Sequence, residues 1–237
     1  MIAAWNEECF NIEPKKYDAW YETPFGRYAH RLEMKKILEC LDSIHGKRIL
    51  DLGCGTGVYS IVLAERKAGV VAVDSSLKML VSASKKIRLD GDEVGIVLCR
   101  AEYLPFKDKS FDFVLSVTTL CYVDEVRRAI AEMWRVVKPT GRIVIGEINK
   151  LSAYGFQKRI MSKFKKSAYE GAKFYSLFEL VQLFGGAEWI STVFGQDWMP
   201  EWLLRFMSRF EMFLSRRFGL FGSFIVLSIT LTSRGRG

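Results

Sequence analysis

The sequence of 237 residues contains only five cysteines and two histidines. The cysteines form an odd set without a CxxC pair, at Cys9, Cys40, Cys54, Cys99 and Cys121. A disulfide framework uses an even set of cysteines, and a structural zinc site uses closely spaced Cys and His pairs. The pattern argues against both kinds of site, and we expect no metal cofactor.

The sequence also lacks long apolar segments. The longest apolar run spans residues 218–231, which is shorter than the roughly 20 residues of a membrane-spanning helix, so we expect a strand there. Met1 is not followed by the basic residues and apolar stretch that are typical of a secretory signal. These absences predict a cytoplasmic protein.

The composition of the chain is that of an ordinary globular protein, with 49% hydrophobic and 26% charged residues. The length suits one α/β domain with a modest elaboration and not two separate cores. The formal net charge is +8, and residues 151–237 carry 12 Lys and Arg against 6 Asp and Glu. A basic C-terminal third can attract nucleic acid, anionic lipid or an acidic substrate, or can simply be a solvated face.

Short apolar runs alternate with segments of helix length through the first two thirds of the chain. The runs span residues 48–52, 70–74, 95–99, 111–116 and 142–146, and the clearest helical patterns span 28–41 and 126–137. Continuous apolar strands separated by helices predict a parallel sheet that is covered on both faces.

The pattern changes after residue 148. Ser176 and Glu179 form a capping box, which predicts a helix that ends at Gly185 and Gly186. We further expect a strand over residues 187–194, an aromatic-rich helical segment over 198–218 and a last strand over 222–232. We interpret these elements as additions to the sheet.

A glycine-rich turn, Asp51-Leu-Gly-Cys-Gly-Thr-Gly57, follows the first apolar run. Its glycines allow a sharp turn and the close approach of a ligand, and the next helix presents free N–H groups there. A dinucleotide-binding turn has a third glycine at the position of Val58, so a dehydrogenase is disfavoured. The Asp51 carboxylate suits an amine-bearing cofactor tail, and the Asp74 carboxylate, which ends the next run, suits two ribose hydroxyls.

These motifs resemble the class I S-adenosylmethionine-dependent methyltransferases, and more narrowly the ubiquinone/menaquinone-biosynthesis-like group. The resemblance covers about residues 45–148. It rests on four blocks in the same order, at residues 51–57, 74–80, 101–113 and 135–141. It implies a Rossmann-like α/β fold with a mostly parallel seven-stranded sheet, helices on both faces and a C-terminal antiparallel strand.

The resemblance also implies one methyltransferase domain over residues 1–237, with S-adenosylmethionine as cofactor and S-adenosylhomocysteine as product. Residues 1–44 would form helices and a lid, 45–148 the cofactor-binding core, and 149–237 a substrate-side elaboration with the last strands. The implied cofactor-binding residues are Tyr17, Asp51, Gly53, Cys54, Gly55, Gly57, Asp74, Ser75, Met79, Ala101, Glu102, Val117 and Thr118. One departure is Arg100, where many relatives carry an acidic residue, and this leaves the recognition of adenine open.

Methyl transfer from a sulfonium is an in-line displacement, for which an enzyme mainly aligns the two reactants and excludes water. A general base helps when the acceptor carries a removable proton. The candidates are His30 in the first helical segment, and Tyr122 and Glu147 near the ends of two strands. Tyr17, Trp20 and Tyr21 lie in an aromatic segment that resembles a lid over the active site in relatives. The alternative for this segment is plain packing against the sheet.

An aromatic stripe occurs in the segment 198–218. Met199, Trp202, Leu203, Phe206, Phe210 and Phe213 fall at helical spacing, with arginines elsewhere on the surface. Such a stripe most commonly packs on its own sheet or caps a lipophilic pocket. A peripheral membrane contact and a homodimer contact are the alternatives.

The leading functional hypothesis is methyl transfer to a small molecule, which would be lipophilic if the aromatic stripe caps its pocket. The second is methylation of RNA or protein. An Asn-Pro-Pro-Tyr-type tetrapeptide is typical of base and glutamine methylation, but the sequence has Thr118-Thr-Leu-Cys-Tyr122 at that place, so nucleic acid is not the expected partner. The third hypothesis is a non-catalytic protein that binds S-adenosylmethionine.

Overall fold

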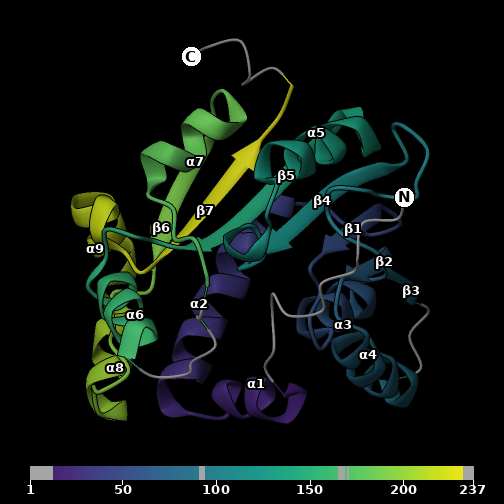
Figure 1. Cartoon of the computed structure of the whole chain (residues 1–237). Helices are drawn as coiled ribbons and strands as arrows, with labels where there is room; N and C mark the ends of the chain where they lie inside the picture. The colour runs from purple at the N-terminus through teal and green to yellow at the C-terminus, as the bar shows by residue number, and fades with distance from the viewer. Residues whose placement is uncertain (1–12, 91–93, 165–168, 170, 232–237) are drawn as a thin grey trace.

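The computed structural model of the chain describes residues 13–90, 94–164, 169 and 171–231. The start of the aromatic N-terminal segment, Cys9 and the end of the last predicted strand lie outside the described residues. Within this part, one seven-stranded sheet has the order β3-β2-β1-β4-β5-β7-β6 (Figure 1). The strands are β1 (Arg48–Leu52), β2 (Gly69–Asp74), β3 (Val94–Leu98), β4 (Phe111–Val117), β5 (Val137–Ile148), β6 (Glu188–Thr192) and β7 (Phe224–Ile229).

The strands β1 to β5 pair in parallel, and β7 is antiparallel to both of its neighbours, β5 and β6. The predicted fold, a mostly parallel sheet of seven strands with an antiparallel C-terminal strand, is therefore confirmed. All six residues of β7 are buried, because this apolar strand lies inside the sheet and not at its edge. Within the apolar run 218–231 the strand is confined to Phe224–Ile229, since Phe218 ends a helix and Gly219–Phe221 form a short 3-10 helix.

Helices cover both faces of the sheet (Figure 1). Their bounds are α1 (Pro14–Tyr21), α2 (Pro24–Leu41), α3 (Val58–Glu65), α4 (Leu77–Asp90), α5 (Val126–Val136), α6 (Ala153–Phe164), α7 (Leu177–Phe184), α8 (Glu201–Arg209) and α9 (Glu211–Phe218). Successive strand residues face opposite sides, so Ile49 packs in the cluster with α2 and α3, while Leu50 packs in the cluster with α5 and α7.

Local signals in the sequence account for several helix ends. The predicted capping box is present, because the Ser176 hydroxyl accepts from the Glu179 N–H and the Glu179 carboxylate accepts from the Ser176 N–H. Gly185 ends α7 at φ 74°. The prediction placed the start of the first long helix at Tyr28, but α2 begins one turn earlier, at Pro24, because the Thr23 hydroxyl caps it.

Two other segments differ from their predictions. The fifth strand begins at Val137 and not at residue 142, since its first residues pair with Phe111 before an irregularity in the register. The helical segment 198–218 consists of two helices, α8 and α9, which are separated at Phe210. Within residues 13–90, 94–164 and 171–231, no helix combines the length and the apolar character needed to cross a membrane.

The sheet order fixes where a ligand can bind. β1 lies between β2 and β4, so the chain leaves the central strand in opposite directions to form the two halves of the sheet. Open α/β sheets bind ligands in the crevice at the carboxyl ends of the strands beside such a reversal. The glycine-rich turn after β1, Asp74 at the end of β2, and Thr118 after β4 all lie at this edge.

Candidate active site

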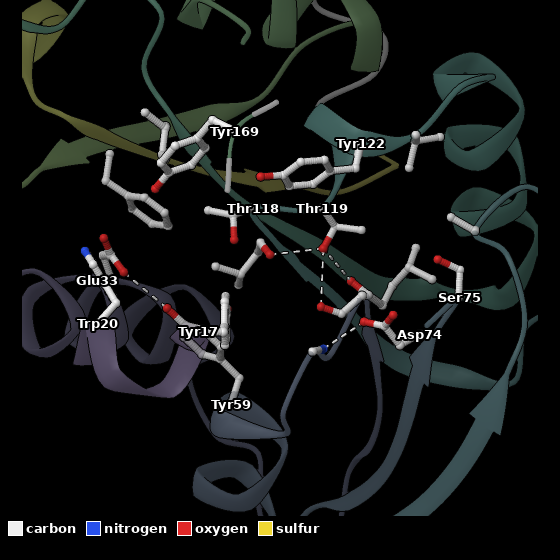
Figure 2. A pocket seen from close by; sticks show the side chains of 18 of the residues that line it. Tyr17, Trp20, Glu33, Tyr59, Asp74, Ser75, Thr118, Thr119, Tyr122 and Tyr169 are labelled. Carbon is white, nitrogen blue, oxygen red and sulfur yellow. Dashed lines mark hydrogen bonds between the residues drawn. The ribbon is translucent and has the colours of Figure 1, made fainter. Parts of the chain in front are cut away.

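A cavity of about 340 Å³ lies at the carboxyl ends of β1, β2 and β4. Its walls include the loops after these strands, the loop after β3, and residues of α1, α2, α3 and α6. Figure 2 shows Asp74 at one end of the cavity and Glu33 at the other, with Thr118 between them. Of the predicted site residues, the wall includes Tyr17, Gly53, Gly55, Asp74, Ser75, Ala101, Glu102, Val117, Thr118 and Tyr122.

The glycine-rich turn has the conformation that its glycines allow. Gly53, Gly55 and Gly57 all have positive φ, at 76°, 55° and 83°, a region that residues with a Cβ rarely adopt. A Cβ at Gly53 would overlap the hydroxyl of Thr119. The turn after β1 can therefore lie directly against the loop after β4, and both loops border the cavity.

Asp74 connects the glycine-rich turn to the end of β2. Its carboxylate accepts a hydrogen bond of 2.9 Å from the Gly55 N–H and one of 2.8 Å from the Ser76 N–H. Burial raises the pKa of this carboxyl group, although the backbone hydrogen bonds oppose the rise. The side chain is half-buried and lies on the cavity wall beside Ser75, so a bound polar ligand can reach it.

Four predicted cofactor-binding residues do not lie on the wall: Asp51, Cys54, Gly57 and Met79. Asp51 is 1% exposed, and its carboxylate accepts a 2.5 Å hydrogen bond from the Ser60 hydroxyl. Burial raises its pKa to about 6. Met79 is fully buried in α4. The structure thus gives Asp51 a contact with α3, and its predicted contact with the cofactor stays a prediction.

Arg100 forms ion pairs with two carboxylates near the residues that the resemblance places beside the adenine. Its guanidinium lies 2.8 Å from the carboxylate of Glu102 and 2.8 Å from that of Asp124. Burial alone would raise the pKa of Glu102, but the hydrogen bonds from Arg100 hold it below its ordinary value. The arginine that departs from the family pattern therefore neutralises the Glu102 carboxylate, and Arg100 itself lies on the cavity wall.

The loop after β4 is held in an unusual conformation. Thr118 has φ 48°, which is rare for a β-branched residue. The buried Glu147 carboxylate accepts a 2.8 Å hydrogen bond from the Leu120 N–H at the start of the short helix 120–122. Burial raises the pKa of Glu147 to about 7. Glu147 is 1% exposed and is not on the wall, so it contacts the loop that carries Tyr122 and not the cavity.

The first helix closes one side of the cavity. Tyr17, Trp20 and Tyr21 of α1 all lie on the wall. The Asp18 carboxylate anchors the helix, because it accepts from the Thr56 hydroxyl at 2.6 Å and pairs with Lys86 at 2.7 Å. The structure therefore places the predicted aromatic segment where a lid over the site would lie.

His30, the third catalytic candidate, is outside the wall. Its ring lies edge-on to the rings of Tyr21 and Tyr59, with centroids 5.0 and 5.5 Å away. Burial lowers its pKa, and its Nδ1 atom is buried without a hydrogen-bond partner in the described structure. The structure therefore packs His30 behind the tyrosines, and of the three candidates it brings only Tyr122 to the cavity.

Sequence reasoning missed Glu33, which lies on the wall in α2. Its carboxylate accepts a 3.3 Å hydrogen bond from the Tyr59 hydroxyl, and burial raises its pKa to about 7. The signal was present, since Glu33 lies four residues after the buried Ala29 and next to the buried Leu32 and Met34. An acidic residue on the apolar face of a helix therefore indicated a site of this kind. Tyr154, Tyr169 and Phe224 on the wall were also missed.

Comparison with known proteins gives the family. A family model described as a methyltransferase domain matches residues 50–145. The chain is 32% identical over 177 residues to a demethylmenaquinone methyltransferase of Bacillus cereus, which covers 70% of this chain and 75% of that protein. It is 39% identical over 113 residues to a demethylmenaquinone methyltransferase of Renibacterium salmoninarum, where the match spans 48% of this chain and only 46% of the relative.

A solved structure is similar over nearly the whole chain. It is a protein of Thermotoga maritima described as a SAM-dependent methyltransferase and possible histamine N-methyltransferase, with 27% identity and a TM-score of 0.70. The match covers 94% of this chain and 99% of that structure. Together with the matches to curated relatives, this confirms the resemblance seen in the sequence. The chain belongs to the class I S-adenosylmethionine-dependent methyltransferases, in the group of the ubiquinone and menaquinone biosynthesis methyltransferases.

Proposed function

We propose that this protein transfers a methyl group from S-adenosylmethionine to a small organic acceptor that binds in the same cavity. One observation carries the proposal: a single cavity joins a glycine-rich turn and Asp74 at one end to an aromatic wall at the other (Figure 2). Such an arrangement holds two reactants end to end, as an in-line displacement requires. When bound, S-adenosylmethionine supplies a methyl group on an electrophilic sulfonium.

The residues present fit this cofactor. The backbone at Gly53 and Gly55 would lie against its methionine portion, and a Cβ at Gly53 would overlap Thr119 in the neighbouring loop. The Asp74 carboxylate would accept hydrogen bonds from the ribose hydroxyls, while Ser75 and Ala101 would border the adenine. Val117 and Thr118 would face the sulfonium, because their loop lies between the two ends of the cavity (Figure 2).

The acceptor would be small and mainly apolar. The wall includes a group of aromatic side chains at the end of the cavity away from Asp74, where Trp20 lies beside Glu33 (Figure 2) and packs on Phe25, which in turn packs on Tyr154. The names of similar proteins also point to small acceptors, since the curated relatives are named for demethylmenaquinone and the Thermotoga structure for histamine. Both lines of support favour a small molecule over RNA or protein.

Calorimetric titration with S-adenosylhomocysteine tests the cofactor site. We expect binding to the wild-type protein. For Asp74→Ala we expect a dissociation constant at least tenfold higher, which corresponds to a loss of about 1.4 kcal/mol of binding free energy. Asp108→Ala is the matched control, because Asp108 is exposed, pairs with Arg135 and is not part of the cavity wall. Asp74 also binds two backbone N–H groups, so thermal melts must show that the variant is folded.

Turnover separates an enzyme from a non-catalytic binding protein. The protein would be incubated with methyl-labelled S-adenosylmethionine and a panel of small aromatic acceptors, and the formation of S-adenosylhomocysteine would be measured. An acceptor-dependent product supports the proposal. Tight cofactor binding without turnover of any acceptor would favour the binding protein.

We also propose that the surface formed by α6, α8 and α9 contacts an anionic membrane. The aromatic stripe predicted for this segment faces solvent, since Trp202 is 70% exposed, Phe213 61% and Phe206 51%. Leu204 is the only fully buried residue of α8 in the described structure. Packing on the sheet therefore does not account for most of the stripe.

Neighbouring residues make this surface both larger and basic. Phe156, Ile160 and Met161 of α6 are exposed, and Lys158 of α6 pairs with Asp197 just before α8 at 2.7 Å. Exposed arginines of α8 and α9 accompany the aromatic residues: Arg205, Arg209, Arg216 and Arg217. Aromatic side chains with arginines suit the headgroup region of an anionic bilayer, whereas two copies of the same basic surface would repel each other.

Flotation with vesicles tests this contact. We expect binding to vesicles that contain phosphatidylglycerol, weaker binding at high salt, and loss of binding in the triple variant Trp202→Ala, Phe206→Ala and Phe213→Ala. Phe178→Ala is the control, because Phe178 is equally exposed on α7. Absence of binding, or equal binding to neutral phosphatidylcholine vesicles, would refute the proposal. A wild-type dimer that the triple variant abolishes would instead assign the surface to a second copy of the chain.

A further inference from the structure

We infer that Glu33 binds the acceptor and takes up its proton, and that the acceptor carries an amine. The inference rests on the proposed methyl transfer, because it assigns the end of the cavity that the cofactor would leave free. Glu33 projects from α2 into that end (Figure 2). Among the residues that the structure describes, it is the only acidic side chain of the wall at that end, since Asp74, Glu102 and Asp124 come from the loops after β2, β3 and β4.

The carboxylate of Glu33 has no cationic partner in the described structure. Its hydrogen bond from the Tyr59 hydroxyl, 3.3 Å long, uses one oxygen only. No basic side chain among the described residues pairs with it, and Lys158, the basic residue of α6 on the wall, pairs with Asp197. A carboxylate that is removed from bulk water without a counter-ion is costly, so this site favours a ligand that brings a positive charge or a proton.

Aromatic rings from three other elements surround the same position. Tyr17 and Tyr21 of α1, Tyr59 of α3 and Tyr154 of α6 each have a pKa raised by burial, and the charge of Glu33 adds to the rise. These phenols therefore stay neutral. His30 of α2 lies behind Tyr21 and Tyr59, and burial lowers its pKa as well.

The combination of one carboxylate with several aromatic faces selects an amine. An ammonium group is attracted both by the carboxylate and by the faces of aromatic rings. The apolar body of the acceptor would pack against Trp20 and Phe25, which are also on the wall. A neutral hydroxyl would gain only one hydrogen bond from the same surroundings, so the arrangement favours an alkylamine that carries an aromatic ring over the corresponding alcohol.

The chemical step then balances with groups that the site supplies. The bound ammonium first releases one proton to a carboxylate oxygen of Glu33, which frees the lone pair of the nitrogen. The nitrogen lone pair forms a bond to the methyl carbon, and the carbon–sulfur bond breaks with its electron pair on sulfur. Burial places the pKa of Glu33 at about 7, so the carboxylate can accept the proton near neutral pH and return it to water.

Binding of matched amines and alcohols tests the inference without turnover. The protein, saturated with S-adenosylhomocysteine, would be titrated with tryptamine and phenethylamine, and with tryptophol and 2-phenylethanol as the neutral counterparts. We expect the amines to bind at least tenfold more tightly than the alcohols. Glu33→Gln should remove this preference, Glu33→Asp should retain part of it, and neither should change the affinity for S-adenosylhomocysteine more than twofold.

Glu39→Gln is the matched control, because Glu39 lies on the same helix and pairs with Lys36 at the surface. Turnover adds a second readout. The wild-type kcat/KM with an amine should rise with pH through about 7, because kcat/KM reports the pKa of the free enzyme. Glu33→Gln should lose this rise and at least tenfold in kcat/KM. Equal affinities for amines and alcohols, or methylation of 1,4-naphthohydroquinone that Glu33→Gln leaves unchanged, would overturn the inference. Failure to bind S-adenosylhomocysteine would instead overturn the proposed function.

Discussion

Replacing Glu33 by glutamine should stabilise the protein without ligand, and more strongly as the pH rises. In the folded protein burial raises the pKa of Glu33 to about 7, whereas the ordinary value is 4.5. Below pH 4.5 the group is protonated in both the folded and the unfolded chain. Between pH 4.5 and 7 it ionises in the unfolded chain first, so ionisation favours unfolding, and above pH 7 the effect is complete.

The size of the effect follows from the two pKa values. One pKa unit corresponds to about 1.4 kcal/mol, so ionisation of Glu33 destabilises the folded protein by at most about 3 kcal/mol. Because the side chain of Glu33 is only half-buried, we expect Glu33→Gln to increase the free energy of unfolding at high pH by about 2 kcal/mol. For a chain of this length, 1 kcal/mol changes Tm by about 2–4 °C. Glu33→Gln should therefore raise Tm by about 4–8 °C at pH 8 and by much less at pH 5.

Thermal melts of the wild type, Glu33→Gln and Glu39→Gln between pH 5 and 8.5 measure this difference. Asp51 and Glu147 also have pKa values raised by burial, but they are present in all three proteins, so their effect cancels in the comparison. A Tm difference between wild type and Glu33→Gln that does not change with pH would refute the reasoning. Glu39→Gln should follow the wild type throughout.

Two further predictions concern single residues of the fold. Gly53→Ala should abolish binding of S-adenosylhomocysteine in calorimetry, because its Cβ would overlap the Thr119 hydroxyl. Gly46→Ala, also at positive φ but with open space around its Cβ, should bind normally and lose only about 1–2 kcal/mol of stability, so equal binding by both variants would contradict this. Ser176→Ala should lower the free energy of unfolding in urea by about 1 kcal/mol, since it removes the capping box with Glu179, and an unchanged value would show that the box is not stabilising.

Most of the sheet could be predicted from the sequence because its strands are short, apolar and separated by helices. The start of β5 could not, since Pro139 and Gly141 suggested a turn where the strand has an irregular pairing. The antiparallel direction of the last strand came from the resemblance, and the position of β7 between β5 and β6 was not predicted, because an apolar run alone does not specify its neighbours or its direction.

The cofactor end of the site was more predictable than the acceptor end. Glycines and an aspartate at fixed distances from strand ends have few structural alternatives, so Gly53 and Asp74 could be placed on the wall from the sequence. The acceptor end is built from side chains of α1, α2, α3 and α6, which are far apart in the sequence, and no local pattern brings Glu33 and Tyr59 together. Burial likewise could not be predicted for Glu147, which the structure turns away from the cavity.

The most direct test of the account is a crystal structure of the protein with S-adenosylhomocysteine. We expect the ribose hydroxyls to lie within hydrogen-bond distance of the Asp74 carboxylate, the sulfur to face the Thr118 loop, and the end of the cavity at Glu33 to remain open for the acceptor. A ligand whose ribose lies away from Asp74, or whose amino-acid tail fills the space beside Glu33, would contradict both the proposed cofactor site and the proposed acceptor site.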